Sequence, residues 1–163
     1  PKYNLSQTRR YAGIMDALSE ANVPASNIRE IDYHTVFGSS AESTSSYKPY
    51  EELFFPVNYT AVIGFNDLQS YSAMEILQKK GYRIPEDISL ISFDHLRKTH
   101  TYLPPLTSIA DNSEKSIADT AVSILLDKIR NPSSEISSEV LPVSIFDDHT
   151  TGPINETFAH SFE

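Results

Sequence analysis

Two short apolar runs, separated by an amphipathic segment, occupy residues 59–109 and constrain the fold more than any other part of the chain. The first run covers residues 60–65 and the second covers residues 88–93. Short, nearly continuous apolar runs joined through a helical crossover are typical of parallel strands, because both faces of such a sheet are covered. The sequence therefore predicts a βαβ unit and an α/β fold.

Polar residues follow both predicted strands directly. Asn66 and Asp67 come after the first apolar run, and Asp94 comes after the second. Ligands of open parallel sheets bind beyond the carboxyl ends of the strands, so these three side chains are expected at one edge of the sheet. Asp67 has a second interpretation as the N-cap of the helix that it precedes, whereas Asn66 is freer to face a ligand.

Further elements flank this unit on both sides. Helical spacing of apolar residues predicts helices over residues 6–23, 67–80 and 113–130. Residues 28–33 and 140–146 are predicted strands, and the polar, low-complexity stretch 38–46 is a predicted loop.

Length, charge and composition exclude several classes of protein. The 163 residues are enough for one domain with a hydrophobic core. A formal net charge of −9 argues against direct binding to nucleic acid, which needs a clustered positive surface. No run approaches the ~20 apolar residues of a membrane helix, so no membrane partner is expected. The lack of cysteine excludes disulfides and thiolate metal sites and is compatible with the cytoplasm.

Patterns that indicate catalysis or metal binding are also missing. The five histidines are scattered without a short-spaced ligand pair, which makes a metal site an unfavoured interpretation. The chain has neither a nucleophile-elbow glycine pattern nor a phosphate-binding loop. We therefore predict no metal, no cofactor, no catalytic residue and no enzyme activity, although carboxylates such as Asp67 and Asp94 are of a type that performs acid-base work.

Three motifs stand out in residues 61–109: AVIGFND at residues 61–67, GYRIPEDISLISF at 81–93 and PPLTSI at 104–109. They resemble the effector-binding domain of the lac-repressor-like (LacI/GalR) bacterial regulators, and RYAG at 10–13 and LPVS at 141–144 extend the match. The resemblance implies a parallel-sheet, three-layer α/β/α lobe of the periplasmic-binding-protein-like type I fold, together with the crossover helix of a second lobe.

The resemblance also implies a division of the chain. Residues 1–108 correspond to the carboxy-terminal lobe without its first strand, so the sheet is expected to be gapped or completed by another segment. Residues 109–138 correspond to a crossover helix of the amino-terminal lobe, residues 139–147 to a returning strand, and residues 148–163 to a tail. The polar stretch of that tail from Gly152 to Glu163 is expected to lack order. The apolar face of the crossover helix would then dock on a second copy or fold back on its own lobe.

The resemblance assigns ligand contacts to residues at the predicted edge and near it. Arg10, which precedes Gly13 by three residues, would direct its planar guanidinium toward sugar hydroxyls. Without the resemblance, a solvated arginine near a helix start is the favoured interpretation of Arg10. Tyr33 would cover the C–H side of a sugar ring, with a half-buried strand tyrosine as the alternative. Asn66, Asp67 and Asp94 would line the same pocket.

One departure affects the identity of the ligand. His95 stands where relatives usually have a second Asp, which changes the charge and size of that position. The ligand class cannot be carried over more narrowly than a small carbohydrate or a related metabolite.

The resemblance finally implies a function. The chain would be the effector-sensing portion of a cytoplasmic bacterial transcriptional regulator, most simply a homodimeric repressor. It would contact operator DNA only through a domain outside this chain. The given chain begins at Pro1, and the whole protein is expected to continue upstream of it. The alternative is an extracytoplasmic sugar-binding protein of a transport system.

Overall fold

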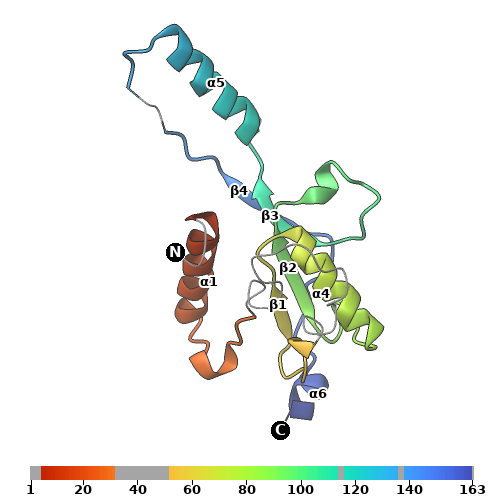
Figure 1. The fold of residues 1–163 in the computed structure, drawn as a ribbon. Coiled ribbons are helices and arrows are strands. Elements are labelled where there is room, and N and C mark those ends of the chain that lie inside the picture. Colours follow the sequence, from red (N-terminus) through yellow and green to blue (C-terminus); the bar gives the residue numbers. More distant parts are fainter. Residues whose placement is uncertain (1–4, 32–51, 114–115, 136–137, 163) are drawn as a thin grey trace.

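The computed structural model describes residues 5–31, 52–113, 116–135 and 138–162 and contains one four-stranded sheet (Figure 1). The strands lie in the order β1-β2-β3-β4, with β1 parallel to β2, β2 parallel to β3, and β4 antiparallel to β3. Their bounds are Ala61–Ile63, Ser89–Phe93, Thr107–Asp111 and Val143–Phe146. The predicted α/β fold with a mostly parallel sheet is confirmed.

The predicted crossover helix is α4, Asp67–Lys79. Asn66 caps it, because its side-chain oxygen accepts from the backbone N–H of Gln69 at 2.9 Å. The capping residue is therefore Asn66, whereas the alternative interpretation of Asp67 as the N-cap is wrong. After the helix, Gly81 has a φ of +91°, a left-handed conformation that glycine adopts without the steric cost of a Cβ.

The core lies between α4 and the sheet. Met74, Leu90 and Leu106 are buried together, and half-buried apolar side chains pack around them: Val62, Tyr71 and Ile84. A second cluster under the same helix contains Phe54, Ala73 and Ile76. Because Leu90 and Leu106 belong to the segments that form β2 and lead into β3, this packing fixes the strands whose ends carry the predicted site.

Close packing at the end of β1 requires a glycine. A Cβ on Gly64 would lie 1.8 Å from Ser70 Oγ, which is buried and donates to Ser92 Oγ at 2.8 Å. Gly64→Ala is therefore expected to destabilise the protein by about 1–3 kcal/mol in urea unfolding, because Ser70 must leave this position.

The matched control for that substitution is Gly13→Ala. Nothing lies within 4 Å of a Cβ at Gly13, which lies in the interior of α1, Leu5–Glu20. This change is expected to be neutral or to stabilise by about 0.5–1 kcal/mol. Equal unfolding midpoints for the two variants would contradict the steric argument.

Tyr59 provides a prediction about pH. Burial raises the pKa of Tyr59 to about 12, against the opposing charge of Arg29, and its hydroxyl donates to the Phe54 carbonyl at 2.9 Å. A phenol whose folded pKa exceeds its unfolded value of about 10 stabilises the fold fully below pH 10 and loses that contribution as the pH rises toward 12. The difference between the ultraviolet pH titrations of the wild type and Tyr59→Phe should show this late phenolate. A difference titration centred near pH 10 would contradict it.

Helix α1 lies on the side of the strands opposite α4 (Figure 1). It is followed by a single 3-10 turn, Ala25–Asn27, and by residues 28–31, to which the structure assigns no strand. The strand prediction for residues 28–33 is wrong over the described part. The segment is held to residues 53–56 through a side chain and not through a β-ladder, since the Arg29 guanidinium donates to the carbonyls of Leu53, Phe55 and Pro56.

Helix α5, Ile117–Arg130, projects away from the sheet on the connection between β3 and β4 (Figure 1). Ser116 and Asp119 form a capping box that begins the helix. Many of its apolar side chains are exposed: Ile117, Val122, Leu125, Leu126 and Ile129. The predicted alternative that this helix folds back on its own lobe is wrong, and its exposed face has the character of a docking surface.

The segment after β4 is not a free tail. Thr150 is 5% exposed, and its hydroxyl donates to the Leu90 carbonyl at 2.6 Å while the Leu90 N–H donates to the Thr150 carbonyl at 2.7 Å. A short helix, α6 at Glu156–Ala159, and a 3-10 turn at His160–Phe162 follow. The prediction that residues 152–163 lack order is therefore wrong over the described part, residues 152–162. Among the described helices, none is both long enough and apolar enough to cross a membrane.

Candidate functional site at the carboxyl edge of the sheet

The polar residues that follow β1 and β2 lie at one edge of the sheet. Ile63 pairs with Ile91 in the parallel ladder, so both strands run toward the same edge before they reach Asn66 and Asp94. Arg10 of α1 also reaches this edge, where its Nη1 donates to the Phe65 carbonyl at 2.5 Å and its Nη2 donates to Asp94 Oδ1 at 2.6 Å. The structure thus brings Arg10 and Asp94 together beside Phe65, whose neighbour Asn66 uses its side-chain oxygen to cap α4.

The Arg10–Asp94 pair is accessible to solvent. The side chain of Arg10 is 29% exposed and that of Asp94 is 40% exposed. The guanidinium also lies 4.9 Å from the centre of the Phe93 ring, a cation–π distance. An ion pair as exposed as this one contributes about 0–1 kcal/mol to folding, so its main consequence is a fixed orientation of charged donors and acceptors at the surface.

Asp94 is presented by an unusual backbone. Its φ is +100° and that of His95 is +50°, although both residues have a Cβ. The Asp94 N–H donates to the Ile109 carbonyl, and the His95 N–H donates to Ser108 Oγ at 2.9 Å. Left-handed conformations of such residues persist only where the surroundings hold them, and they are concentrated at functional sites.

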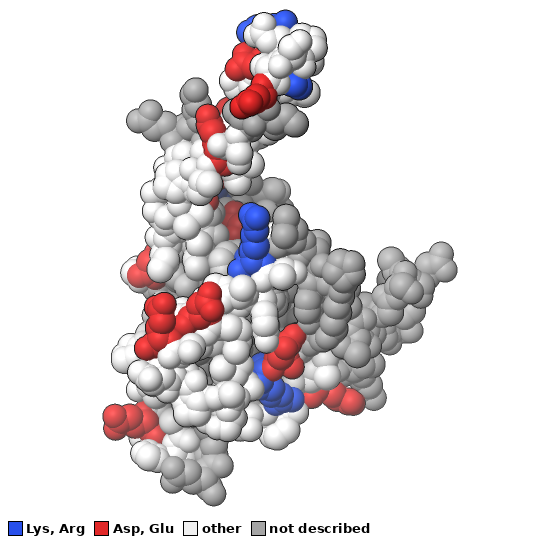
Figure 2. Space-filling model, turned by 90° about the vertical axis from the view of Figure 1, so that its left-hand side faces the viewer, with Lys and Arg blue, Asp and Glu red and all other residues white. Residues whose placement is uncertain are grey.

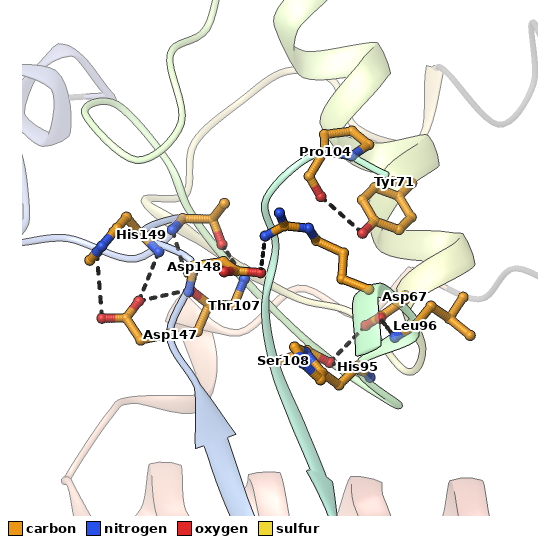
Figure 3. A network of polar contacts seen from close by, with 12 residues as sticks. Asp67, Tyr71, His95, Leu96, Pro104, Thr107, Ser108, Asp147, Asp148 and His149 are labelled. Atoms are coloured by element: carbon orange, nitrogen blue, oxygen red, sulfur yellow. Dashed lines mark hydrogen bonds and ion pairs between the residues drawn. The ribbon is translucent and has the colours of Figure 1, made fainter. Parts of the chain in front are cut away.

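Asp67 differs from the other predicted contacts. Its side chain is 1% exposed, and both of its carboxylate oxygens accept hydrogen bonds from the protein (Figure 3). Ser108 Oγ donates to Oδ1 at 2.8 Å and the Leu96 N–H donates to Oδ2 at 2.6 Å. The carboxylate therefore does not reach the solvent-facing edge where Arg10 and Asp94 meet. Tyr33 lies outside the described residues.

Two contacts beside the edge were not anticipated from the sequence. The His95 ring stacks on Phe146 with 4.2 Å between the ring centroids, and Arg97 Nη1 donates to Asp148 Oδ2 at 2.5 Å. His95 and Phe146 are 51 residues apart in the sequence, as are Arg97 and Asp148. No local pattern in the sequence indicates either contact. The Asp147-Asp148 doublet is visible in the sequence, but nothing near it points to Arg97 as the partner of Asp148.

The start of β3 carries a separate polar cluster. Thr107 Oγ1 donates to Asp147 Oδ1 at 3.1 Å, and the His149 N–H donates to the same carboxylate oxygen at 2.8 Å (Figure 3). The His149 N–H and the Thr107 hydroxyl hold the pKa of Asp147 below its usual value. Within the described ranges, no three His, Asp or Glu side chains are grouped as ligands for a metal ion. At the carboxyl edge, the Arg10 guanidinium and the Asp94 carboxylate supply hydrogen-bond donors and acceptors.

Comparison with known proteins agrees with this geometry. The sequence matches the periplasmic binding protein-like domain over residues 2–151. It is 34% identical over 127 residues to the HTH-type transcriptional repressor PurR of Aliivibrio salmonicida, an alignment that covers 77% of this chain and 36% of that protein.

Two solved structures are similar as well. One is a dimeric lac repressor with an 11-residue C-terminal deletion, with a TM-score of 0.70 and 26% identity over 93% of this chain and 53% of that one. The other is a periplasmic binding protein/LacI transcriptional regulator of Alkaliphilus metalliredigens in complex with D-xylulofuranose, with a TM-score of 0.60 and 26% identity over 88% of this chain and 51% of that one.

The chain therefore belongs to the family of periplasmic binding protein-like domains. Within that family, its relatives in sequence and structure are regulators of the LacI/GalR type, as the motifs at residues 61–67 and 81–93 predicted. The chain spans 36% of the length of the PurR relative and about half the length of the two solved structures.

Proposed function

We propose that this chain forms one wall of the effector-binding cleft of a bacterial transcriptional regulator, and that a small carbohydrate or related metabolite binds there through Arg10, Asn66 and Asp94. The observation that carries the proposal is the accessible Arg10–Asp94 pair at the carboxyl edge of β1 and β2. Tyr33 is proposed as a further contact on the strength of the sequence resemblance.

The chemistry of the pair favours a neutral, hydroxylated ligand. Two of the five N–H groups of Arg10 donate to Phe65 and Asp94, so the guanidinium keeps donors for an approaching hydroxyl. Asp94 balances the charge of Arg10, which removes the net positive charge that an anionic ligand would need. Neighbouring hydroxyls of a sugar both donate and accept, and they match an adjacent carboxylate and guanidinium.

Contact with DNA is proposed to belong to a domain outside this chain. The chain carries a formal net charge of −9, and on the face seen in Figure 2 the Lys and Arg side chains form isolated groups. A phosphate backbone requires a continuous basic surface. Effector binding would change DNA affinity by favouring one of two arrangements of the lobes.

The remaining parts of the proposal concern assembly. One lobe would be formed by residues 1–108 and 139–147, with residues 148–163 as its tail. The crossover helix, within residues 109–138, would belong to the amino-terminal lobe, whose other residues would pack on the exposed face of α5. The regulator would be a cytoplasmic homodimer without enzyme activity, and most simply a repressor. The PurR relative and the similar lac repressor structure are transcriptional repressors, so an extracytoplasmic sugar-binding protein of a transport system is the less favoured alternative.

The proposal is tested by following backbone amide signals of the chain by NMR during titration with sugars. The panel contains D-ribose, D-xylulose, D-glucose and cellobiose, with inorganic phosphate as the anionic comparison. We expect one or more sugars to shift residues 65–67 and 94–96 with millimolar affinity, about −4 kcal/mol, because the chain supplies only one wall. Shifts confined to other residues, preference for phosphate, or micromolar affinity would each contradict the proposal.

A further inference from the structure

Asp67 is a buried carboxylate at the first position of α4, directly after the capping residue. Both of its oxygens are engaged within the protein, and neither bond is made by a basic side chain: the donors are the Ser108 hydroxyl and the Leu96 N–H (Figure 3). A buried carboxylate is costly unless it is satisfied in this way, so its geometry is strongly determined.

The donors lead directly to the segment that carries Asp94. Leu96 N–H donates to Asp67 Oδ2, while His95 N–H donates to Ser108 Oγ, whose own proton goes to Asp67 Oδ1. Two consecutive backbone amides after Asp94 are thus held, one directly and one through a serine that is 0% exposed. A single side chain on α4 thereby holds the two residues that follow Asp94, while the Asp94 N–H is held separately by the Ile109 carbonyl.

This turn is the part of the edge that needs support. Asp94 and His95 both have positive φ, a conformation in which their Cβ atoms are crowded. Without anchored amides, the residues would relax toward ordinary backbone angles, and Asp94 would no longer point at Arg10. The hydrogen bonds to Asp67 and Ser108 hold the turn in this conformation.

We infer that Asp67 is a positioning residue of the effector site: its carboxylate fixes residues 95 and 96 so that Asp94 faces Arg10, and it does not itself contact the effector. The inference rests on the proposed function only in so far as an effector binds at this edge, because the positioning of Asp94 is a property of the chain alone. Asp67 also joins two parts of the site, since it follows Asn66 in the sequence and anchors the turn after Asp94.

The first experiment needs no ligand. Amide hydrogen exchange is measured by NMR in the wild type, Asp67→Ala, Asp67→Asn and Ser108→Ala. Asp67→Ala is expected to accelerate exchange at both His95 and Leu96 by about ten- to a hundredfold, the factor that corresponds to losing a hydrogen bond to a charged group. Ser108→Ala should accelerate His95 and leave Leu96 protected. Asp67→Asn keeps one acceptor oxygen and should fall between the wild type and Asp67→Ala.

The matched control is Thr150→Val. Thr150 is also buried, and its hydroxyl also takes part in two hydrogen bonds, with Leu90 and Thr107. These partners lie near the starts of β2 and β3, at the opposite ends of the strands from Asp94. It should lower global stability without selective exchange at residues 95 and 96. Unchanged protection of these amides in both Asp67→Asn and Ser108→Ala would overturn the inference, and these two variants answer the question even if Asp67→Ala does not fold.

The second experiment adds the sugar panel described above. In Asp67→Asn, the sugar affinity obtained from the shifts at residues 65–67 and 94–96 should fall at least about tenfold. Thr150→Val should bind the sugar with the affinity of the wild type. Retained affinity in Asp67→Asn, with the turn loosened, would overturn the role in effector binding. If the wild type binds no sugar, the proposed function fails, and the exchange data still decide whether Asp67 positions Asp94.

Discussion

Asp94→Ala is expected to abolish the sugar-induced NMR shifts at the carboxyl edge of the sheet. The substitution removes the charged acceptor and leaves the Arg10 guanidinium without its 2.6 Å partner. A hydrogen bond to a charged group contributes about 1.5–3 kcal/mol, so affinity should fall about 10- to 100-fold and leave the millimolar range. Asp94→Asn, which keeps the shape and loses the charge, should retain part of the affinity.

The control for this prediction is Asp148→Ala. Asp148 forms a comparable ion pair with Arg97, with side chains 26% and 29% exposed, but neither residue is among the proposed ligand contacts. Both substitutions should change the free energy of unfolding by less than about 1 kcal/mol, because both pairs are partly exposed. Loss of sugar binding only in Asp94→Ala supports the site, and equal binding by both variants would contradict it.

Leu90→Ala is expected to cause the largest loss of stability. Leu90 is the second residue of β2, is 0% exposed, and packs with Met74 and Leu106 between the sheet and α4. Truncating a fully buried leucine removes apolar contacts and leaves a cavity, at a cost of about 2–5 kcal/mol. For a domain whose total stability is about 5–15 kcal/mol, that is a large part of the whole. Urea unfolding followed by circular dichroism measures it.

The same chemical change on an exposed residue provides the comparison. Leu68 lies on α4 and is 67% exposed, so Leu68→Ala should alter the free energy of unfolding by no more than about 0.5 kcal/mol. The difference between the two variants isolates burial from side-chain chemistry. Similar losses in both would show that the core described here does not form.

The parallel sheet could be predicted from the sequence because its signal is local. The apolar runs at residues 60–65 and 88–93 contain β1 and β2, and the intervening helical pattern became α4 within one residue of its expected end. The shared edge of Asn66 and Asp94 then follows from strand direction alone. The approach of Arg10 could not be found in this way, since it contacts Asp94 across 84 positions and was anticipated only from the family resemblance.

The burial of Asp67 shows why the rest of the site could not be predicted from the sequence. An aspartate between a strand and a helix can cap the helix, face a ligand or be buried with partners, and the residue itself does not distinguish these. The choice depends on Ser108, which is 41 positions away, and on the turn at Leu96. For the same reason residues 152–163 were expected to lack order, although Gly152 exchanges hydrogen bonds with Ser89 Oγ across 63 positions and α6 follows it.

The most direct measurement of the central claim is a crystal structure of the chain with the sugar that gives the largest NMR shifts. We predict that sugar hydroxyls lie about 2.5–3.2 Å from the Asp94 carboxylate and an Arg10 nitrogen, at the edge formed by β1 and β2. Asp67 should remain bonded to Ser108 and the Leu96 N–H. A sugar bound elsewhere, with the Arg10–Asp94 pair free of any contact to it, would contradict the account.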